Sequence, residues 1–451
     1  MTGIAGIERP RATKEVRSML KRLQHRGTDG IEVFEKGNAT FGVVWSASEE
    51  KLVHKMRKQG YITDTSTNGH FARVEMKNGS LTLLRDKIGV VPLYYGKTTD
   101  GELCFASEIK ALIPITSEIN ELGPASFFDG DKIKDYGSIE AKAPLDWGVE
   151  EITMELRDTL VDAVKMSVRE KKKIGVWLYG GMNSSIISAV ASRYVDDVQT
   201  FSIGFQGSGN LKTAQRVANH IDSSHHEIIV TRDDLVEAIP RAIYHLESFD
   251  ALLVRKGLMN FIISRTAEKK VKYLLLGDGA DELFGGYKHI KSMNHEAIAN
   301  ELVEQTGKLH NTTLQRVDRC TAAYGLTPLL PFLTPKVVKL ALRIPARYKV
   351  YKGKSKWVLR EAMRDFLPDE ILMQTISDTV VDEVGNTIAD LAENSISDKA
   401  FKKEQMLPNG WRLSTKEELL YYRIFVEHFG ELDNFSWMGR TLNNPEVRSR
   451  D

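Results

Sequence analysis

The stretch Ile174–Ser185, IGVWLYGGMNSS, joins an apolar run to a glycine pair and to a helical pattern that continues to Tyr194. A strand, a glycine turn and a helix in this order form the repeating unit of a parallel α/β sheet. The amide groups of such a turn and the helix N-terminus carry positive partial charge, which favours a phosphate. Glycines at a strand-to-helix turn are also common for packing alone. The stretch therefore predicts the sheet, and it leaves phosphate binding and packing as alternatives.

A second glycine-rich turn, Gly277–Tyr287 (GDGADELFGGY), follows the apolar run Val271–Leu276. Loops at the carboxyl ends of parallel strands form the ligand crevice of an open sheet, so we expect the two turns to meet at one site. The side chains of Asp278, Asp281 and Glu282 could hold Mg²⁺ or a substrate ammonium there. The alternative is that these acidic residues cap the following helix, and the residues alone do not decide between the two.

The chain around these turns also shows patterns of parallel strands and helices. The apolar pattern predicts a further parallel strand at Val198–Phe205 and an amphipathic helix at Glu150–Glu170. The remainder after Pro335 is predicted to be mostly helical and to end in a helix at Glu417–His428.

Before residue 145 the pattern is different. Short apolar runs alternate with turn residues such as Asn78-Gly79 and Asp100-Gly101, which predicts β-hairpins, and Thr13–Leu23 is predicted to be a helix. A linker at Lys142–Trp147 separates the two patterns. The predicted fold class is α/β: residues 1–145 are predicted to be β-rich with helices, and residues 150–451 to form a parallel-sheet domain with a helical C-terminal part.

The composition is that of an ordinary globular protein. Of 451 residues, 42% are hydrophobic and 27% are charged, which excludes disorder as a description of the whole chain. Lys and Arg number 62 against 61 Asp and Glu, so the net charge of +1 gives no reason to expect nucleic acid or an anionic membrane as a partner. Cys104 and Cys320 are predicted to be reduced and buried. Without a predicted transmembrane helix or secretory signal, we expect a cytoplasmic protein.

Several sequence blocks occur in the order in which a known enzyme family has them. They are Gly3–Gly6 (GIAG), His25–Gly30 (HRGTDG), Arg85–Tyr95 (RDKIGVVPLYY), Phe105–Lys110 (FASEIK), Ser202–Phe205 (SIGF), Gly277–Tyr287, Arg316–Arg319 (RVDR) and Glu417–Arg423 (EELLYYR). Together the blocks resemble the glutamine-hydrolysing asparagine synthetases.

This resemblance implies a glutaminase domain of the N-terminal-nucleophile fold, an α+β sandwich, at residues 1–145. It also implies a synthetase domain of the ATP-pyrophosphatase (PP-loop) type at residues 150–451. In such enzymes ATP activates aspartate as an acyl-adenylate and pyrophosphate leaves. Ammonia released from glutamine then reaches the adenylate through a tunnel and attacks it.

The resemblance also assigns candidate residues. Thr2 stands at the position of the catalytic nucleophile, and Asp278 is a candidate catalytic group of the synthetase site. Asp281 is the candidate ligand of Mg²⁺. The cofactors that the resemblance implies are ATP and Mg²⁺. The implied nucleotide contacts are Leu178, Ile203, Leu276 and Gly277 around the adenine and AMP, and Gly180, Gly181 and Ser184 near the phosphates.

The chain departs from the family at the glutaminase site. The family's nucleophile is a cysteine, and here the position is Thr2, whose hydroxyl is a far weaker nucleophile near neutral pH than a thiolate. The family's Asn-Gly-Glu-Ile-Tyr-Asn block, which supplies the oxyanion hole, has no counterpart in the short stretch Ala47–Gly69. Loss of oxyanion donors alone costs about 100-fold or more in rate. We therefore predict no glutaminase activity.

The synthetase site is altered as well. In the first turn Tyr179, Met182 and Asn183 replace the Ser, Leu and Asp of the family's Ser-Gly-Gly-Leu-Asp-Ser-Ser loop, and the Asn removes a charge that helps to hold Mg²⁺. In the second turn Leu276 replaces Ser and Asp278 replaces Glu.

Further along, the family has a catalytic lysine where this chain has Met373–Gly385, a window without Lys or Arg in which Ile376 is nearest the expected position. Lys356 and Arg360 match an upstream block and are candidates to face the cleft.

These losses favour a pseudoenzyme that keeps the two-domain fold and nucleotide binding, with a binding or regulatory role. One alternative is a working ATP-dependent ligase that forms asparagine, or another amide, from a carboxylate and ammonia. Another is an assembly subunit whose partner supplies the missing groups. The expected ligands are a nucleotide and, as a candidate, a small carboxylate, and a homodimer or a hetero-assembly is open.

Overall fold

The computed structural model describes residues 1–65, 69–77, 79–137, 139–140, 142–373 and 379–441. The elements of its amino-terminal half are β1 (Thr2–Ile7), α1 (Thr13–Arg22), β2 (Gly30–Lys36), β3 (Ala39–Trp45), α2 (Glu50–Gln59), β4 (Tyr61–Thr65), β5 (Phe71–Lys77), β6 (Ser80–Arg85), β7 (Tyr94–Lys97), β8 (Leu103–Ala106), α3 (Ile109–Leu112), β9 (Asn120–Glu121), β10 (Ser126–Phe128) and β11 (Ile133–Asp135).

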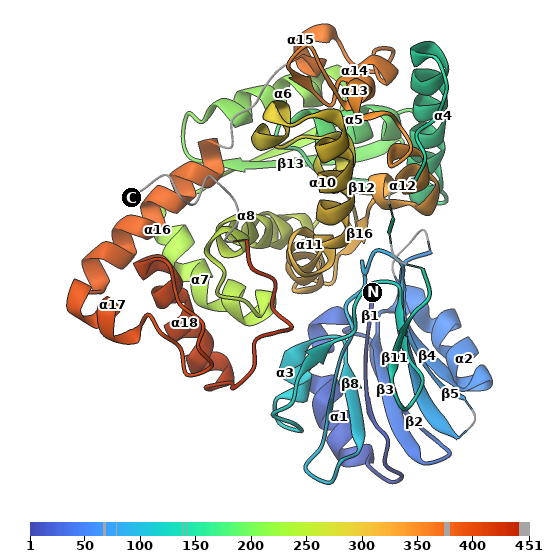
Figure 1. Cartoon of the computed structure of the whole chain (residues 1–451), viewed down its shortest axis with the longest axis vertical. Coiled ribbons are helices and arrows are strands. Elements are labelled where there is room, and N and C mark those ends of the chain that lie inside the picture. Colours follow the sequence, from blue (N-terminus) through green and yellow to red (C-terminus); the bar gives the residue numbers. More distant parts are fainter. Residues whose placement is uncertain (66–68, 78, 138, 141, 374–378, 442–451) are drawn as a thin grey trace.

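Two antiparallel sheets face each other in this half (Figure 1). The first has the strand order β2-β3-β1-β8-β7-β9, and the second has the order β11-β10-β6-β5-β4. Apolar side chains from both sheets, such as Ile4, Phe41 and Leu83, form the core between them. Helix α1 packs on the first sheet and α2 packs on the second. The predicted helix near the N-terminus is confirmed as α1, and the predicted hairpins are confirmed by the pairing of β5 with β6 and of β7 with β8.

The elements of the carboxyl-terminal half are α4 (Val149–Val168), β12 (Lys173–Trp177), α5 (Met182–Ala191), β13 (Asp197–Gly204), α6 (Gly209–His220), β14 (Ser224–Ile229), α7 (Arg232–Leu246), α8 (Ala251–Ala267), β15 (Tyr273–Leu275), α9 (Ala280–Phe284), α10 (His295–Gly307), α11 (Thr313–Ala322), β16 (Thr327–Leu329), α12 (Pro335–Ala341), α13 (Ala346–Lys349), β17 (Val350–Tyr351), β18 (Lys354–Ser355), α14 (Trp357–Ala362), α15 (Asp369–Leu372), α16 (Thr379–Ser395), α17 (Asp398–Glu404) and α18 (Lys416–Phe429).

The third sheet is entirely parallel, in the order β14-β13-β12-β15-β16. Its strands β12, β13 and β15 are the three that the apolar runs predict. Parallel neighbours need crossover connections, and α5 and α6 supply them from β12 to β13 and from β13 to β14. Figure 1 shows α5 and α6 on one side of the sheet and α8 and α11 on the other. The predicted α/β fold class is therefore confirmed.

The helical predictions are confirmed as well. The predicted stripe of Ile152, Leu156, Leu160, Val164 and Val168 lies on α4, and each of these side chains is at most 2% exposed. After residue 335 the described chain is mostly helical and includes α18 where the last helix is predicted. Among the described residues, no helix is both long and apolar enough to cross a membrane.

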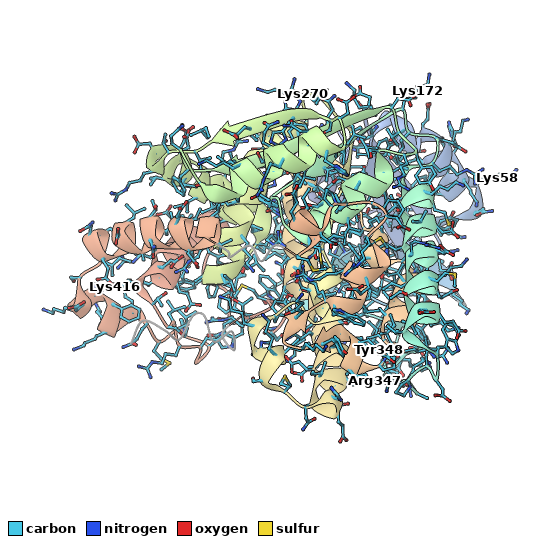
Figure 2. The ribbon with its side chains drawn as sticks, turned by 90° about the horizontal axis from the view of Figure 1, so that it is seen from above. Lys58, Lys172, Lys270, Arg347, Tyr348 and Lys416 are labelled. Carbon is cyan, nitrogen blue, oxygen red and sulfur yellow. The ribbon has the colours of Figure 1, made fainter. Side chains whose placement is uncertain are left out.

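Positive side chains project at separated places on the surface. Viewed from above in Figure 2, Lys172 and Lys270 point outward along one edge of the molecule, and Lys58 points outward from another. The two cysteines, Cys104 and Cys320, are both buried free thiols, as predicted.

The two halves meet through buried charges near the start of β1, which Figure 1 places beside the carboxyl-terminal half. The guanidinium of Arg26 donates to both carboxylate oxygens of Asp318 at 2.7 and 2.9 Å, although these residues belong to different halves. It also donates to Asp64 at 2.9 Å and to Glu108 at 2.8 Å. The segment that links the halves runs from the end of β11 to the start of α4, and the predicted domain limits at residues 145 and 150 stay a prediction.

Candidate functional site

The two glycine turns lie side by side at the carboxyl edge of the parallel sheet, as the sequence predicts. Their strands β12 and β15 are direct neighbours, with Val176 opposite Leu275. The turns touch: a Cβ atom added to Gly277 would lie 2.8 Å from the carbonyl carbon of Asn183. In the first turn Gly180 has a φ angle of 76°, a conformation that favours glycine. The absence of a side chain at Gly277 therefore lets the turns close on each other, whereas Gly180 packs against Thr213 and Ala214 of α6.

A triangle of polar side chains joins the turns to α14. The amide Nδ2 of Asn183 donates to Oδ2 of Asp281 at 2.7 Å. The Lys356 ammonium donates to the other oxygen of Asp281 at 2.7 Å and to Oδ1 of Asn183 at 3.0 Å. Burial raises the pKa of Asp281, but Lys356 and Asn183 outweigh it and hold that pKa below its usual value. Asp281 is therefore an ionised carboxylate with both oxygens engaged.

The other acidic residues of the second turn also have partners. Oδ1 of Asp278 accepts a 2.8 Å hydrogen bond from Arg316 on α11. Oε1 of Glu282 accepts a 2.6 Å hydrogen bond from the hydroxyl of Tyr287. Burial, together with the neighbouring charge of Asp281, raises the pKa of Glu282 to about 7. Glu282 is thus partly protonated near neutral pH.

Tyr179 points from the first turn toward α8. Its hydroxyl donates to Oδ1 of Asn260 at 3.0 Å, and burial raises the pKa of this hydroxyl. Asn260 is only 3% exposed, and its Nδ2 has no hydrogen-bond partner in the part of the chain that the structure describes. An unpaired buried donor costs about 1–3 kcal/mol, so this amide is a group that a bound acceptor would satisfy.

The residues assigned to the nucleotide fall into two classes. Leu178, Ile203 and Leu276 belong to the main core and are each at most 1% exposed, so their side chains face other side chains. Gly181 is the N-cap of α5, and a Cβ atom added there would meet no heavy atom within 4 Å. The Ser184 hydroxyl donates to the Gly181 carbonyl at 3.1 Å. The position with room for a phosphate is therefore the N-terminus of α5, at Gly181 and next to Gly180.

The implied Mg²⁺ prefers six oxygen ligands in a near-octahedral arrangement, and it usually takes one or two of them from protein carboxylates and others from substrate phosphates and water. Among the described residues, no group of three or more His, Cys, Asp or Glu side chains could hold a metal ion. In the second turn Asp281 is engaged by Lys356 and Asn183, and Asp278 is engaged by Arg316. The described side chains therefore form no ready-made Mg²⁺ site, and Asp281 and Asp278 are the carboxylates that would hold a Mg²⁺ ion carried by nucleotide phosphates.

Thr2, the predicted nucleophile position, is fully buried at the start of β1. Its hydroxyl lies 3.0 Å from Oδ1 of Asp64, and the Ser107 hydroxyl donates to Oδ2 of the same carboxylate at 3.1 Å. The Met1 ammonium is buried 3.2 Å from a Glu49 oxygen, and burial lowers its pKa. With Met1 in place, the Thr2 hydroxyl is enclosed and adjoins a carboxylate.

The stretch Ala47–Gly69, which lacks the oxyanion block, contains a helix and a strand. Its described residues form α2 and β4, and β4 supplies Asp64. A cavity of about 10 Å³, the size of one water molecule, lies between Met1, Arg26 and Asp64 on one side and Leu314, Asp318 and Pro328 on the other.

Two further candidates have different outcomes. Lys356 faces the glycine turns, as described above. Arg360 does not: its guanidinium donates to the backbone carbonyls of Ser355 and Leu372. Ile376, nearest the expected catalytic lysine, lies outside the described residues.

Sequence reasoning missed two contributors to the site. Asn260 lies in the middle of α8, where no motif distinguishes it. Arg316 belongs to the Arg316–Arg319 block, but nothing in that block points to Asp278 as its partner.

Comparisons with known proteins agree with this arrangement. The family model described as asparagine synthase matches residues 155–299 and 291–441, and the one described as glutamine amidotransferase domain matches residues 44–135. Asparagine synthetase B [glutamine-hydrolyzing] of Escherichia coli (strain K12) is 32% identical over 82% of this chain and 71% of its own length. Asparagine synthetase [glutamine-hydrolyzing] of Sandersonia aurantiaca is 31% identical over 85% of this chain and 78% of its own length.

Proposed function

This chain belongs to the asparagine synthase family, and from that membership we propose that it binds an adenine nucleotide at the two glycine turns without making asparagine from glutamine. In this proposal the protein is a pseudoenzyme with a binding or regulatory role. Its nucleotide phosphates bind at the N-terminus of α5, where amide groups and the helix dipole favour an anion.

The observation that carries the proposal is the triangle of Asn183, Asp281 and Lys356. A synthetase of this family activates a carboxylate with ATP and must neutralise the charge that develops as pyrophosphate leaves. Here a neutral amide stands at one expected carboxylate, and the other carboxylate is engaged by a lysine. Since electrostatic stabilisation of the transition state is usually the largest single contribution to catalysis, the loss of the carboxylate at Asn183 reduces turnover more than it reduces binding.

The surroundings of Thr2 support the prediction that the amino-terminal half has no glutaminase activity. A hydroxyl nucleophile needs a general base that accepts its proton and donors that hold the oxyanion. The neighbour of the Thr2 hydroxyl is Asp64, whose other oxygen is bound by Arg26 and Ser107. This carboxylate is engaged at the junction between the halves, and the Thr2 hydroxyl beside it is fully buried with Met1 in place.

Two measurements on the full chain test the proposal. The first is titration with ATP and with AMP by calorimetry, in which we expect saturable binding. The second is release of glutamate from glutamine, in which we expect no rate above the buffer control. Absence of nucleotide binding would overturn the binding role, and glutamate release with multiple turnovers would overturn the inactive glutaminase.

A second candidate is an ammonia-using ligase that acts on a small carboxylate. The relatives are named as synthetases. Asn260, which binds Tyr179, also has a buried Nδ2 without a partner among the described residues, a donor of the kind that a carboxylate accepts from. Release of pyrophosphate that depends on both a carboxylate and ammonia distinguishes this candidate from the first.

A further inference from the structure

We propose that a surface pocket beside α6 binds a free α-amino acid, at a site separate from the two glycine turns. The pocket has a volume of about 370 Å³, which is in the range of small-ligand sites. It is formed by the loop after β13, by α6 and by β14. Its lining includes no residue that is assigned to the nucleotide, so the inference goes beyond the proposed function.

Two opposite charges line the pocket without neutralising each other. The Lys212 ammonium comes from α6 and the Glu227 carboxylate comes from β14. Both residues are exposed, and neither forms an ion pair with a described residue. A ligand that carries one negative and one positive group is the electrostatic complement of such a pocket. A free α-amino acid carries both groups on a single carbon, and each would form a charge-assisted hydrogen bond here.

The same two charges argue against ligands with a single charge. A phosphate or another anion would be attracted by Lys212 but repelled by Glu227. A metal cation would be repelled by Lys212, and Glu227 is the one carboxylate that the described lining offers it. The pocket therefore favours a zwitterion over a phosphate and over a metal ion.

Uncharged polar groups in the lining indicate the side chain of the amino acid. The amides of Gln206 and Gln215 both line the pocket, and an amide group donates as well as accepts hydrogen bonds. The Nε2 of Gln215 donates to Asn219 at 2.7 Å, which leaves its oxygen as an acceptor. Leu211 is the apolar side chain of the lining. We therefore assign the ligand class as amino acids with an amide side chain on a short apolar stem, and glutamine represents it.

The place of α6 in the fold separates this pocket from both sites described above. The pocket is lined by Lys212 and Gln215, whereas Thr213 and Ala214 between them are buried against the first glycine turn. A Cβ atom added to Gly180 would lie 2.7 Å from Cβ of Thr213. Figure 1 shows α6 at the far end of the carboxyl-terminal half from the amino-terminal sheets. We therefore expect the amino acid and ATP to bind the same molecule together.

The test is a calorimetric titration of the full chain with L-glutamine, without ATP and with ATP at a saturating concentration. We expect saturable glutamine binding in both titrations. No binding without ATP, or binding that ATP abolishes, would overturn the inference. Neither result bears on nucleotide binding, which titration with ATP alone measures. If ATP itself does not bind, the proposed function fails and the titration without ATP still decides the inference.

Analogues of glutamine test the zwitterion. L-Glutaminamide lacks the carboxylate and N-acetyl-L-glutamine lacks the ammonium, and we expect each to bind about tenfold or more weakly than glutamine. Equal affinity of either analogue and glutamine would contradict the pairing of both charges. L-Leucine, which has no amide, is also expected to bind more weakly, and equal binding of leucine would contradict the assigned ligand class.

Variants assign the binding to this pocket. Lys212→Met and Glu227→Gln each remove one charge from an exposed side chain, and each is expected to weaken glutamine binding by about tenfold or more. Lys172→Met is the matched control, because Lys172 is exposed and lies outside the pocket lining, and it is expected to leave the affinity unchanged. Unchanged glutamine affinity in Lys212→Met or in Glu227→Gln would place glutamine elsewhere on the chain and contradict the inference.

Discussion

The buried carboxyl of Glu282 makes the stability of the folded protein depend on pH. Burial and the charge of Asp281 raise the pKa of Glu282 to about 7, whereas a glutamate in an unfolded chain ionises near its ordinary pKa of about 4.3. Between these values the folded protein keeps a proton that the unfolded chain has lost. The contribution of Glu282 to stability is therefore full below the lower value and falls as the pH rises through the window.

The variant Glu282→Gln removes this titration and keeps an acceptor for Tyr287. We expect the free energy of unfolding to fall less steeply between about pH 5 and pH 7, by up to about 1.4 kcal/mol per pH unit relative to the wild type. Urea unfolding across this range measures the slope, and the exposed Glu304→Gln is the control. The same slope in Glu282→Gln as in the wild type would show that Glu282 is already ionised in the folded state.

A second prediction at the residue scale concerns Thr2. Replacing the hydroxyl by a thiol in Thr2→Cys restores the family's nucleophile type, but the oxyanion block remains absent and Asp64 still adjoins the side chain. We therefore expect glutamate release from glutamine to stay at the buffer rate. The assay is run on protein whose N-terminus has been established by mass spectrometry. Recovery of glutaminase activity in this variant would refute our account of the amino-terminal half.

At the scale of elements, the second glycine turn depends on a missing side chain. In Gly286→Ala the added Cβ atom would lie 1.7 Å from an Asp281 oxygen, and the carboxylate must move away from Lys356 and Asn183. We expect a loss of about 1–3 kcal/mol in the free energy of unfolding, together with weaker ATP binding. The control is Gly209→Ala on α6, where the added atom meets nothing within 4 Å. Equal stability of the two variants, measured by denaturant unfolding, would count against the close packing of Gly286 on Asp281.

The elements that the sequence predicts well are those set by local pattern. The apolar run before each glycine turn became β12 or β15, and the stripe over Glu150–Glu170 became α4, because strand and helix periodicity are properties of neighbouring residues. The meeting of the two turns was also predictable, since parallel strands place their following loops at one edge.

The contacts across elements could not be predicted in this way. Lys356 reaches Asp281 only because α14 and the second turn are brought together by the packing of the whole half. Asn260 accepts from Tyr179 across 81 positions of sequence, and no local pattern marks either residue as a partner of the other. Arg360 is the opposite case. Its match to a family block predicted that it faces the cleft, but its guanidinium donates to backbone carbonyls instead.

At the scale of the whole molecule, Arg26 holds the two halves together through buried charge. It binds Asp318 across the junction and Asp64 within the amino-terminal half. Arg26→Met leaves these carboxylates without their cation, so we expect a loss of about 3–5 kcal/mol in the free energy of unfolding. Arg57→Met, which removes a 67% exposed arginine paired with Glu32, is expected to change stability by less than about 1 kcal/mol. Chemical denaturation of both variants measures these losses in the free energy of unfolding. Similar losses in the two variants would contradict a stabilising role of Arg26 at the junction.

The central claim, a nucleotide-binding member of this family without asparagine synthesis, is tested most directly by pyrophosphate release. The purified full chain is incubated with ATP, Mg²⁺ and aspartate, with either ammonia or glutamine as the nitrogen source, and ATP binding is measured on the same preparation. Our account predicts saturable ATP binding and no pyrophosphate above the control without aspartate. Pyrophosphate released over many turnovers, with formation of asparagine, would contradict it.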